Sequence, residues 1–117
     1  MELSRTSVPP VAATGTIEWA PFTLAEGVAE ATLLAASEAL QRVFLSQQPG
    51  FVRRELLRGN DNQWVDLVYW ASQEAAEAAM QNVAESPVCH RYFALMAGAD
   101  ADEPGAGVLH FAQVAQY

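Results

Sequence analysis

The sequence contains no lysine, and its six basic residues are all arginines. Fourteen aspartates and glutamates oppose them, which gives a formal net charge of −8. A chain with this deficit has too little positive surface to neutralise a nucleic-acid backbone, and its acidic field repels anionic lipid headgroups. We therefore expect neither nucleic acids nor membranes among its partners.

Cysteine and histidine are also scarce, with one cysteine and two histidines in 117 residues. The single Cys89 excludes an internal disulfide and a cysteine cluster for zinc or iron–sulfur. His90 and His110 fall on different predicted elements, and neither has a third ligand at metal-binding spacing. We expect the protein to use no metal and no other cofactor.

Long apolar segments are missing as well. The uncharged apolar stretches are far shorter than the roughly 20 residues that a membrane-spanning helix needs. The first residues, with Glu2 and the Pro9-Pro10 pair, lack the continuous apolar core of a secretory signal. We expect a cytoplasmic protein.

What the sequence does contain is enough apolar surface for one core. Hydrophobic residues make up 51% of the chain, and 117 residues leave no room for two independent cores. Residues 1–13 mix Ser, Thr, Pro and Ala without periodicity, which is typical of a loose arm. We expect a loose N-terminal arm over 1–13 and a single domain over 14–117.

Strand and helix patterns alternate along that domain. Ser72 and Ser86 stand at N-cap positions, and the four residues after Arg58 suit a tight reversal. The sequence predicts strands at 14–22, 51–58, 63–70 and 108–117, and helices at 30–47, 72–83 and 86–96. This β-α-β-β-α-β order predicts an α+β, ferredoxin-like fold with a four-stranded antiparallel sheet.

The predicted hairpin determines which polar residues face each other. If the turn uses the four residues after Arg58, then Arg58 lies opposite Gln63 and Glu55 lies opposite Asp66. Arg53 points to the same side and reaches diagonally to Asp66. Two opposed carboxylates are unfavourable when both are ionised, so either Arg53 neutralises one of them or one keeps its proton. The first outcome is an ionic ladder on a sheet face, and the second supplies a general base.

Aromatic and aliphatic side chains occupy both faces of this hairpin. Trp64 and Trp70 flank Asp66 on one face, because side chains alternate along a strand. Leu67 and Tyr69 point to the opposite face. Two helices cover only one face of the sheet, so the other face needs a second protein surface, most simply the same sheet in a second copy. We expect a homodimer.

Three short motifs connect these elements to a known family. They are Pro49-Gly50-Phe51, Glu55-Leu56-Leu57, and Trp70 followed by Ser72-Gln73-Glu74-Ala75. Together they resemble the antibiotic-biosynthesis-monooxygenase-like group, in which a "PGF" opens the second strand and a "W-x-S-x-E-A" motif joins the third strand to the second helix. The resemblance implies ferredoxin-like chains that dimerise into an α/β barrel. It also implies a cavity between sheet and helices, on the side of Trp70 and Asp66.

The functional positions of this family are matched in part. Cofactor-free members that oxidise anthrones use a strand tryptophan, matched by Trp70, and an asparagine four residues earlier, where this chain has Asp66. Ala76 replaces a tyrosine that these members use in the next helix. An arginine further along falls near His90 or Arg91, although an exposed helical position is the favoured interpretation of His90.

The resemblance implies a cofactor-independent monooxygenase acting on a small aromatic or polyketide-like substrate. Haem degradation is disfavoured, because Tyr92-Phe93 stands where haem-degrading members have a histidine. Two alternatives stay open, a non-redox cyclase or isomerase and a non-catalytic, small-molecule-binding homodimer. In the oxygenase, Asp66 would take a proton from the substrate beside Trp70, and the resulting carbanion would react with O₂. The expected substrate contacts surround these two residues and are Trp64, Arg53, Glu55, His90 and Arg91.

Overall fold

The computed structural model describes residues 15–98 and 107–117. Its elements are β1 (Thr16–Thr23), α1 (Glu30–Val43), a 3₁₀ turn η3 (Leu45–Gln47), β2 (Phe51–Arg58), β3 (Gln63–Trp70), α2 (Gln73–Val83), α3 (Pro87–Phe93) and β4 (Leu109–Ala112). The predicted arm over 1–13 lies outside the described residues. Within the described ranges, no helix is both long enough and apolar enough to cross a bilayer.

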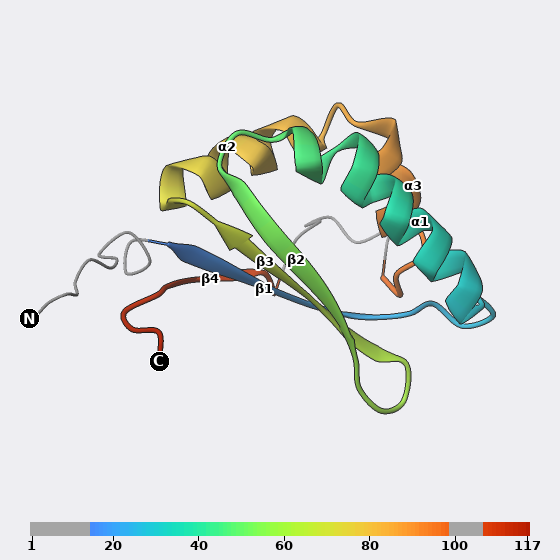
Figure 1. Cartoon of the computed structure of the whole chain (residues 1–117). Coiled ribbons are helices and arrows are strands. Elements are labelled where there is room, and N and C mark those ends of the chain that lie inside the picture. Colours follow the sequence, from blue (N-terminus) through green and yellow to red (C-terminus); the bar gives the residue numbers. More distant parts are fainter. Residues whose placement is uncertain (1–14, 99–106) are drawn as a thin grey trace, which may run out of the picture.

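The four strands form one antiparallel sheet in the order β2-β3-β1-β4. The helices lie on one side of this sheet, and none of the described residues forms a helix on the opposite side (Figure 1). The predicted α+β, ferredoxin-like fold is confirmed. The last strand is shorter than expected, because pairing with β1 covers only Leu109–Ala112 of the predicted 108–117.

The two predicted serine caps begin helices α2 and α3. The hydroxyl of Ser72 accepts a hydrogen bond from the Ala75 backbone N–H at 3.1 Å. The hydroxyl of Ser86 accepts one from the Cys89 N–H at 3.3 Å. Each cap satisfies a helix N–H that has no partner within the helix, which fixes where the chain turns from sheet to helix.

The β2–β3 hairpin differs from the prediction by one residue of register. Gly59 is itself paired, since its N–H donates to the Gln63 carbonyl at 2.7 Å, and the loop contains three residues instead of four. Asp61 and Asn62 adopt positive φ angles of 56° and 63°, a conformation that Asp and Asn tolerate better than most residues. Leu56, not Glu55, therefore lies opposite Asp66.

That single step exchanges the two faces of β2, because side chains alternate along a strand. Arg54 and Leu56 face the helices, whereas Arg53 and Glu55 face the other side. On β3 the faces are as predicted, and the side chains buried under the helices are Trp64, Asp66, Val68 and Trp70.

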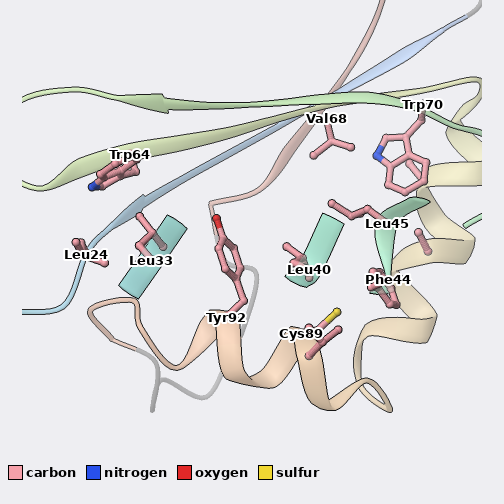
Figure 2. Packing of buried hydrophobic residues seen from close by; sticks show 13 residues of the cluster. Leu24, Leu33, Leu40, Phe44, Leu45, Trp64, Val68, Trp70, Cys89 and Tyr92 are labelled. Atoms are coloured by element: carbon pink, nitrogen blue, oxygen red, sulfur yellow. The ribbon is translucent and has the colours of Figure 1, made fainter. Parts of the chain in front are cut away.

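The hydrophobic core lies between this sheet face and the helices (Figure 2). Tyr92, Leu33 and Cys89 are its largest fully buried side chains. In Figure 2, Tyr92 projects from α3 with its hydroxyl end toward the strands, while Trp64 and Trp70 lie at opposite ends of the cluster. The Tyr92 hydroxyl therefore lies at the middle of the sheet, close to Asp66.

Candidate functional site

Asp66 lies at the centre of a buried polar network. Arg54 Nε donates to its Oδ1 at 2.7 Å, and the Tyr92 hydroxyl donates to its Oδ2 at 2.7 Å. Arg54 also donates from Nη2 to the Tyr92 oxygen at 3.1 Å and from Nη1 to the Ser37 carbonyl at 3.2 Å. The side chains of Arg54 and Asp66 are only 6% and 9% exposed. Both carboxylate oxygens are therefore engaged away from solvent.

This arrangement decides between the two outcomes expected for Asp66. An arginine neutralises the carboxylate, so the network is an ionic one, but the arginine is Arg54 and not Arg53. A buried charge that is paired and fully hydrogen-bonded is stable as an ion. Both oxygens of Asp66 accordingly face protein donors inside the core and not an open site at which a ligand could give up a proton.

The Tyr92 phenol has a strongly perturbed acidity. Burial is the largest cause that raises its pKa above the ordinary value of 10, and the negative charge of Asp66 raises it further. The positive charge of Arg54 acts in the opposite direction without reversing the shift. Tyr92 thus remains a protonated hydrogen-bond donor throughout the neutral range.

This shift predicts alkaline destabilisation. Above pH 10 the unfolded chain releases the phenolic proton while the folded chain retains it, so the free energy of unfolding falls as pH rises. The loss amounts to about 1.4 kcal/mol per pH unit for one group. Burial also raises the pKa of the Cys89 thiol above 9.0, which acts in the same direction. Denaturant titrations between pH 8 and 11 should show a shallower decline for Tyr92→Phe than for wild type, and equal slopes would contradict the assignment.

Arg53 and Glu55 were expected beside Asp66, and this expectation is wrong. The Arg53 guanidinium stacks over the Tyr69 ring, 4.0 Å from its centroid. The Tyr69 hydroxyl donates to Glu55 Oε1 at 3.4 Å. These three residues form an exposed group on the side of the sheet away from the helices, because the hairpin register is shifted by one residue.

The two tryptophans that frame Asp66 on β3 do not form one binding slot. Trp64 stacks on Phe22 with a centroid distance of 6.4 Å and an interplanar angle of 13°. Trp70 meets Phe51 edge to face with a centroid distance of 5.8 Å. Six residues of extended chain place them ~20 Å apart, so one small ring cannot contact both.

His90 and Arg91 lie on α3 with exposed side chains. Neither side chain takes part in the Asp66 network. The neighbouring Tyr92 contacts Asp66 instead. A helix turns about 100° per residue, so consecutive residues cannot all face the sheet. The apolar spacing of Val88 and Tyr92, four residues apart, is the signal that could have identified Tyr92 as the inward position.

Trp70 takes part in a second polar cluster. Its indole Nε1–H donates to Glu18 Oε1 at 3.2 Å, and His110 Nε2 lies 3.5 Å from the same oxygen. Glu18 and His110 are paired across β1 and β4, on the sheet face that carries Trp70. Sequence reasoning placed His110 on the last strand but gave no role to Glu18, because the β1–β4 register cannot be read locally.

Trp70 also lines a surface hollow of about 290 Å³. The hollow lies at the end of the sheet where β1 begins and β3 ends, and its walls include Thr16, Val52, Arg53, Tyr69, Trp70 and Gln113. Its volume is at the lower end of the range for small-molecule sites. The expected cavity around Asp66 is occupied by the Arg54 and Tyr92 side chains, and the Trp70 indole is only 3% exposed, so it does not open into the hollow.

Among residues 15–98 and 107–117, no group of three or more His, Cys, Asp and Glu side chains could hold a metal ion. What the arrangement offers chemically is a surface hollow beside β1 and β3, a buried ionic network at Asp66 and a carboxylate–imidazole pair at Glu18 and His110.

The fold and these side chains define a small ferredoxin-like protein with a buried ionic network between its sheet and helices. The family model named antibiotic biosynthesis monooxygenase matches residues 19–103. The chain belongs to this family, as the three sequence motifs had indicated. Comparison with curated protein sequences gives no significant match.

Solved structures support the same assignment. A mutant form of SnoaB, a cofactor-independent oxygenase from Streptomyces nogalater, is 25% identical with a TM-score of 0.63, and the match covers 85% of this chain and 90% of SnoaB. A family protein from Bordetella bronchiseptica is 18% identical with a TM-score of 0.69, covering 87% of this chain and 99% of that one. The haem-degrading protein Rv3592 from Mycobacterium tuberculosis is 18% identical with a TM-score of 0.53, covering 89% and 99%. The last two likenesses concern the fold alone.

Proposed function

We propose that this protein is a cofactor-independent monooxygenase that acts on a small aromatic or polyketide-like substrate. Membership of the antibiotic biosynthesis monooxygenase family, together with the likeness to SnoaB over 85% of the chain, carries the proposal. Trp70 lies on the strand where the family resemblance places a functional tryptophan, and it borders the hollow with its indole packed in the core.

The chemistry that we propose needs no redox group on the protein. A CH₂ between two aromatic rings that are conjugated to a carbonyl, as in an anthrone, loses a proton, and the carbanion gives electrons to O₂ as a carbon–oxygen bond forms. The hydroperoxide then loses water and leaves a carbonyl, so one oxygen atom enters the product and one enters water. The protein contributes orientation and a site with little water.

In this proposal the substrate binds in the hollow at the end of β1 and β3, and Asp66 has a supporting role. Asp66 would act as a base only by exchanging its bond with Tyr92 for one with the substrate. As described, it holds Arg54 and Tyr92 in place beneath the sheet. Arg53, on the rim of the hollow, is the nearest cation for an ionised phenol or enolate.

Oxygen uptake with a panel of anthrones and hydroquinones tests the proposal. We expect enzyme-dependent consumption of O₂, with one atom of ¹⁸O₂ appearing in the product, and no loss of rate after dialysis against a chelator. A rate that disappears with the chelator would contradict a cofactor-free reaction. Conversion without O₂ would favour the cyclase or isomerase, and binding without turnover would favour the non-catalytic alternative.

We also propose a homodimer formed through the sheet face without helices. That face carries large exposed apolar side chains from three strands, with Trp19 38%, Leu57 42%, Leu109 52% and Phe111 53% exposed. An apolar surface of this kind is typical of a protein contact. A second copy of the same sheet would bury it symmetrically, as in the α/β barrels of this family.

A further inference from the structure

Among the described residues that line the hollow at the end of β1 and β3, only Arg53 carries a charge. The other walls are apolar or uncharged polar groups, and Ile17, Val52, Gln113 and Gln116 are among them. The chain as a whole, by contrast, has fourteen acidic residues and a net charge of −8. The hollow is therefore locally cationic on a protein that is acidic overall, which favours an anionic ligand at this point.

A β-bulge at the start of β2 brings Arg53 to this position. The register shifts between Phe51 and Arg53, so Val52 is an extra residue without a partner on β3. Arg53 pairs with Tyr69 as a result, and both side chains lie on the sheet face without helices. If the register of Phe51 continued without the bulge, Val52 would lie opposite Tyr69 and Arg53 would point toward the helices. Bulges commonly re-aim a side chain beside a functional site in this way.

The Arg53 guanidinium is held in place by stacking and stays exposed. Its flat face covers the Tyr69 ring, 4.0 Å from the centroid, so the N–H groups around its edge are available to a ligand. Arg54 and Arg58, the other arginines of β2, each form an ion pair at 2.7 Å. Within the described ranges, no carboxylate comes within ion-pair distance of Arg53, and Glu55 accepts the Tyr69 hydroxyl instead.

We propose that the hollow binds a small carboxylic acid with an apolar body, and that Arg53 determines this specificity. The parallel N–H groups of a guanidinium match the two oxygens of a carboxylate, so the acid group pairs with the edge of Arg53. The apolar body then lies against Ile17 and Val52, and a volume of about 290 Å³ limits the ligand to a small molecule. This inference rests on the proposed function, since it names the acidic group that the substrate carries.

The proposed dimer is compatible with a ligand in the hollow. The Trp19–Leu67 pair lies near the middle of the β1–β3 ladder. The hollow adjoins the Thr16–Trp70 pair, at the end of that ladder. The three residues between these pairs span ~10 Å of extended chain. A second copy centred on the middle of the sheet face would therefore leave the hollow at the edge of the contact.

Calorimetric titration of the full chain with cinnamate, a small aromatic carboxylate, and with cinnamamide, its uncharged amide, tests this specificity without any oxygen chemistry. The two probes have nearly the same shape, so a difference in Kd reports the charge. We expect the wild type to bind cinnamate at least about tenfold more tightly than cinnamamide, the scale of a charge-assisted hydrogen bond. Arg53→Gln should make the two Kd values nearly equal and leave the circular dichroism spectrum unchanged.

Arg58→Gln is the matched control, because it is the same substitution at an exposed arginine of β2 outside the hollow. This variant should keep the preference for cinnamate. Equal affinity of the wild type for the two probes would overturn the inference, as would a preference that survives Arg53→Gln. Failure of the wild type to bind cinnamate at millimolar concentration would overturn it as well.

The same titration separates this inference from the proposed reaction. A wild type that prefers cinnamate through Arg53 but consumes no O₂ with any substrate would remove the oxygenase and leave the carboxylate site. Consumption of O₂ by a protein that does not distinguish the acid from the amide would remove the carboxylate site and leave the oxygenase.

Discussion

Replacing Asp66 by leucine should lower the free energy of unfolding by about 3–5 kcal/mol, because it leaves the buried Arg54 guanidinium without its counter-charge. That is a large fraction of the 5–15 kcal/mol typical of a whole domain, so the variant should unfold at much lower denaturant concentration. Chemical denaturation followed by circular dichroism measures the difference. A loss below about 1 kcal/mol would contradict a tightly coupled buried pair.

A combined variant separates the contribution of the buried charges to the free energy of unfolding from the contribution of packing. Arg54→Met, Asp66→Leu and Tyr92→Phe together remove every member of the network and leave apolar groups of similar size. Replacing a buried ionic network in this way is often neutral or stabilising, so we expect most of the lost stability to return. Glu30→Gln is the matched surface control, since its ion pair with Arg58 at 2.7 Å is exposed to solvent. It should change stability by less than about 1 kcal/mol.

Introducing a charge at Leu67 should separate the proposed dimer. Leu67 lies opposite Trp19 on β1 and Glu55 on β2, on the sheet face without helices. An unpaired carboxylate in an apolar contact is costly, so Leu67→Asp should raise the dimer dissociation constant by more than about 10²-fold. Sedimentation velocity across micromolar concentrations measures this change.

The control for Leu67→Asp is the same substitution at Leu34, an exposed leucine on α1. Leu34→Asp adds an equal charge away from the bare sheet face and should leave the association unchanged. A wild-type protein that sediments as a monomer at micromolar concentration would remove the dimer altogether. Equal dissociation in both variants would show that net charge, and not this face, governs assembly.

The element order could be predicted because its signals are local. Ser72 and Ser86 carry their own hydrogen bonds to the helices that they begin, and the alternation of β3 places Trp64, Asp66 and Trp70 on one face whatever the partner strand does. Each of these features depends on residues that are only a few positions apart in the sequence. The fold class and the helix-facing side of β3 therefore follow from the sequence alone.

The partners of Asp66 could not be predicted in the same way. Whether the hairpin loop has three or four residues depends on a single hydrogen bond at Gly59, and the difference exchanges Arg53 for Arg54 under the helices. Tyr92 reaches Asp66 across 26 positions of sequence. The periodicity of the sequence indicates which side chains share a face of one helix or strand. It does not predict a contact between two elements, and this contact forms only when α3 packs on the sheet.

Gly50 gives the family motifs a physical meaning. Its φ of +84° suits glycine, and a Cβ placed there would lie 2.5 Å from the Cβ of Ala75. The Ala71 N–H also donates to the Gly50 carbonyl at 2.7 Å. The glycine of the "PGF" and the last alanine of "W-x-S-x-E-A" are thus in close contact, and this contact packs the start of β2 against α2. Because these residues set the backbone geometry between β2 and α2, motifs that contain them identify the fold and not the reaction.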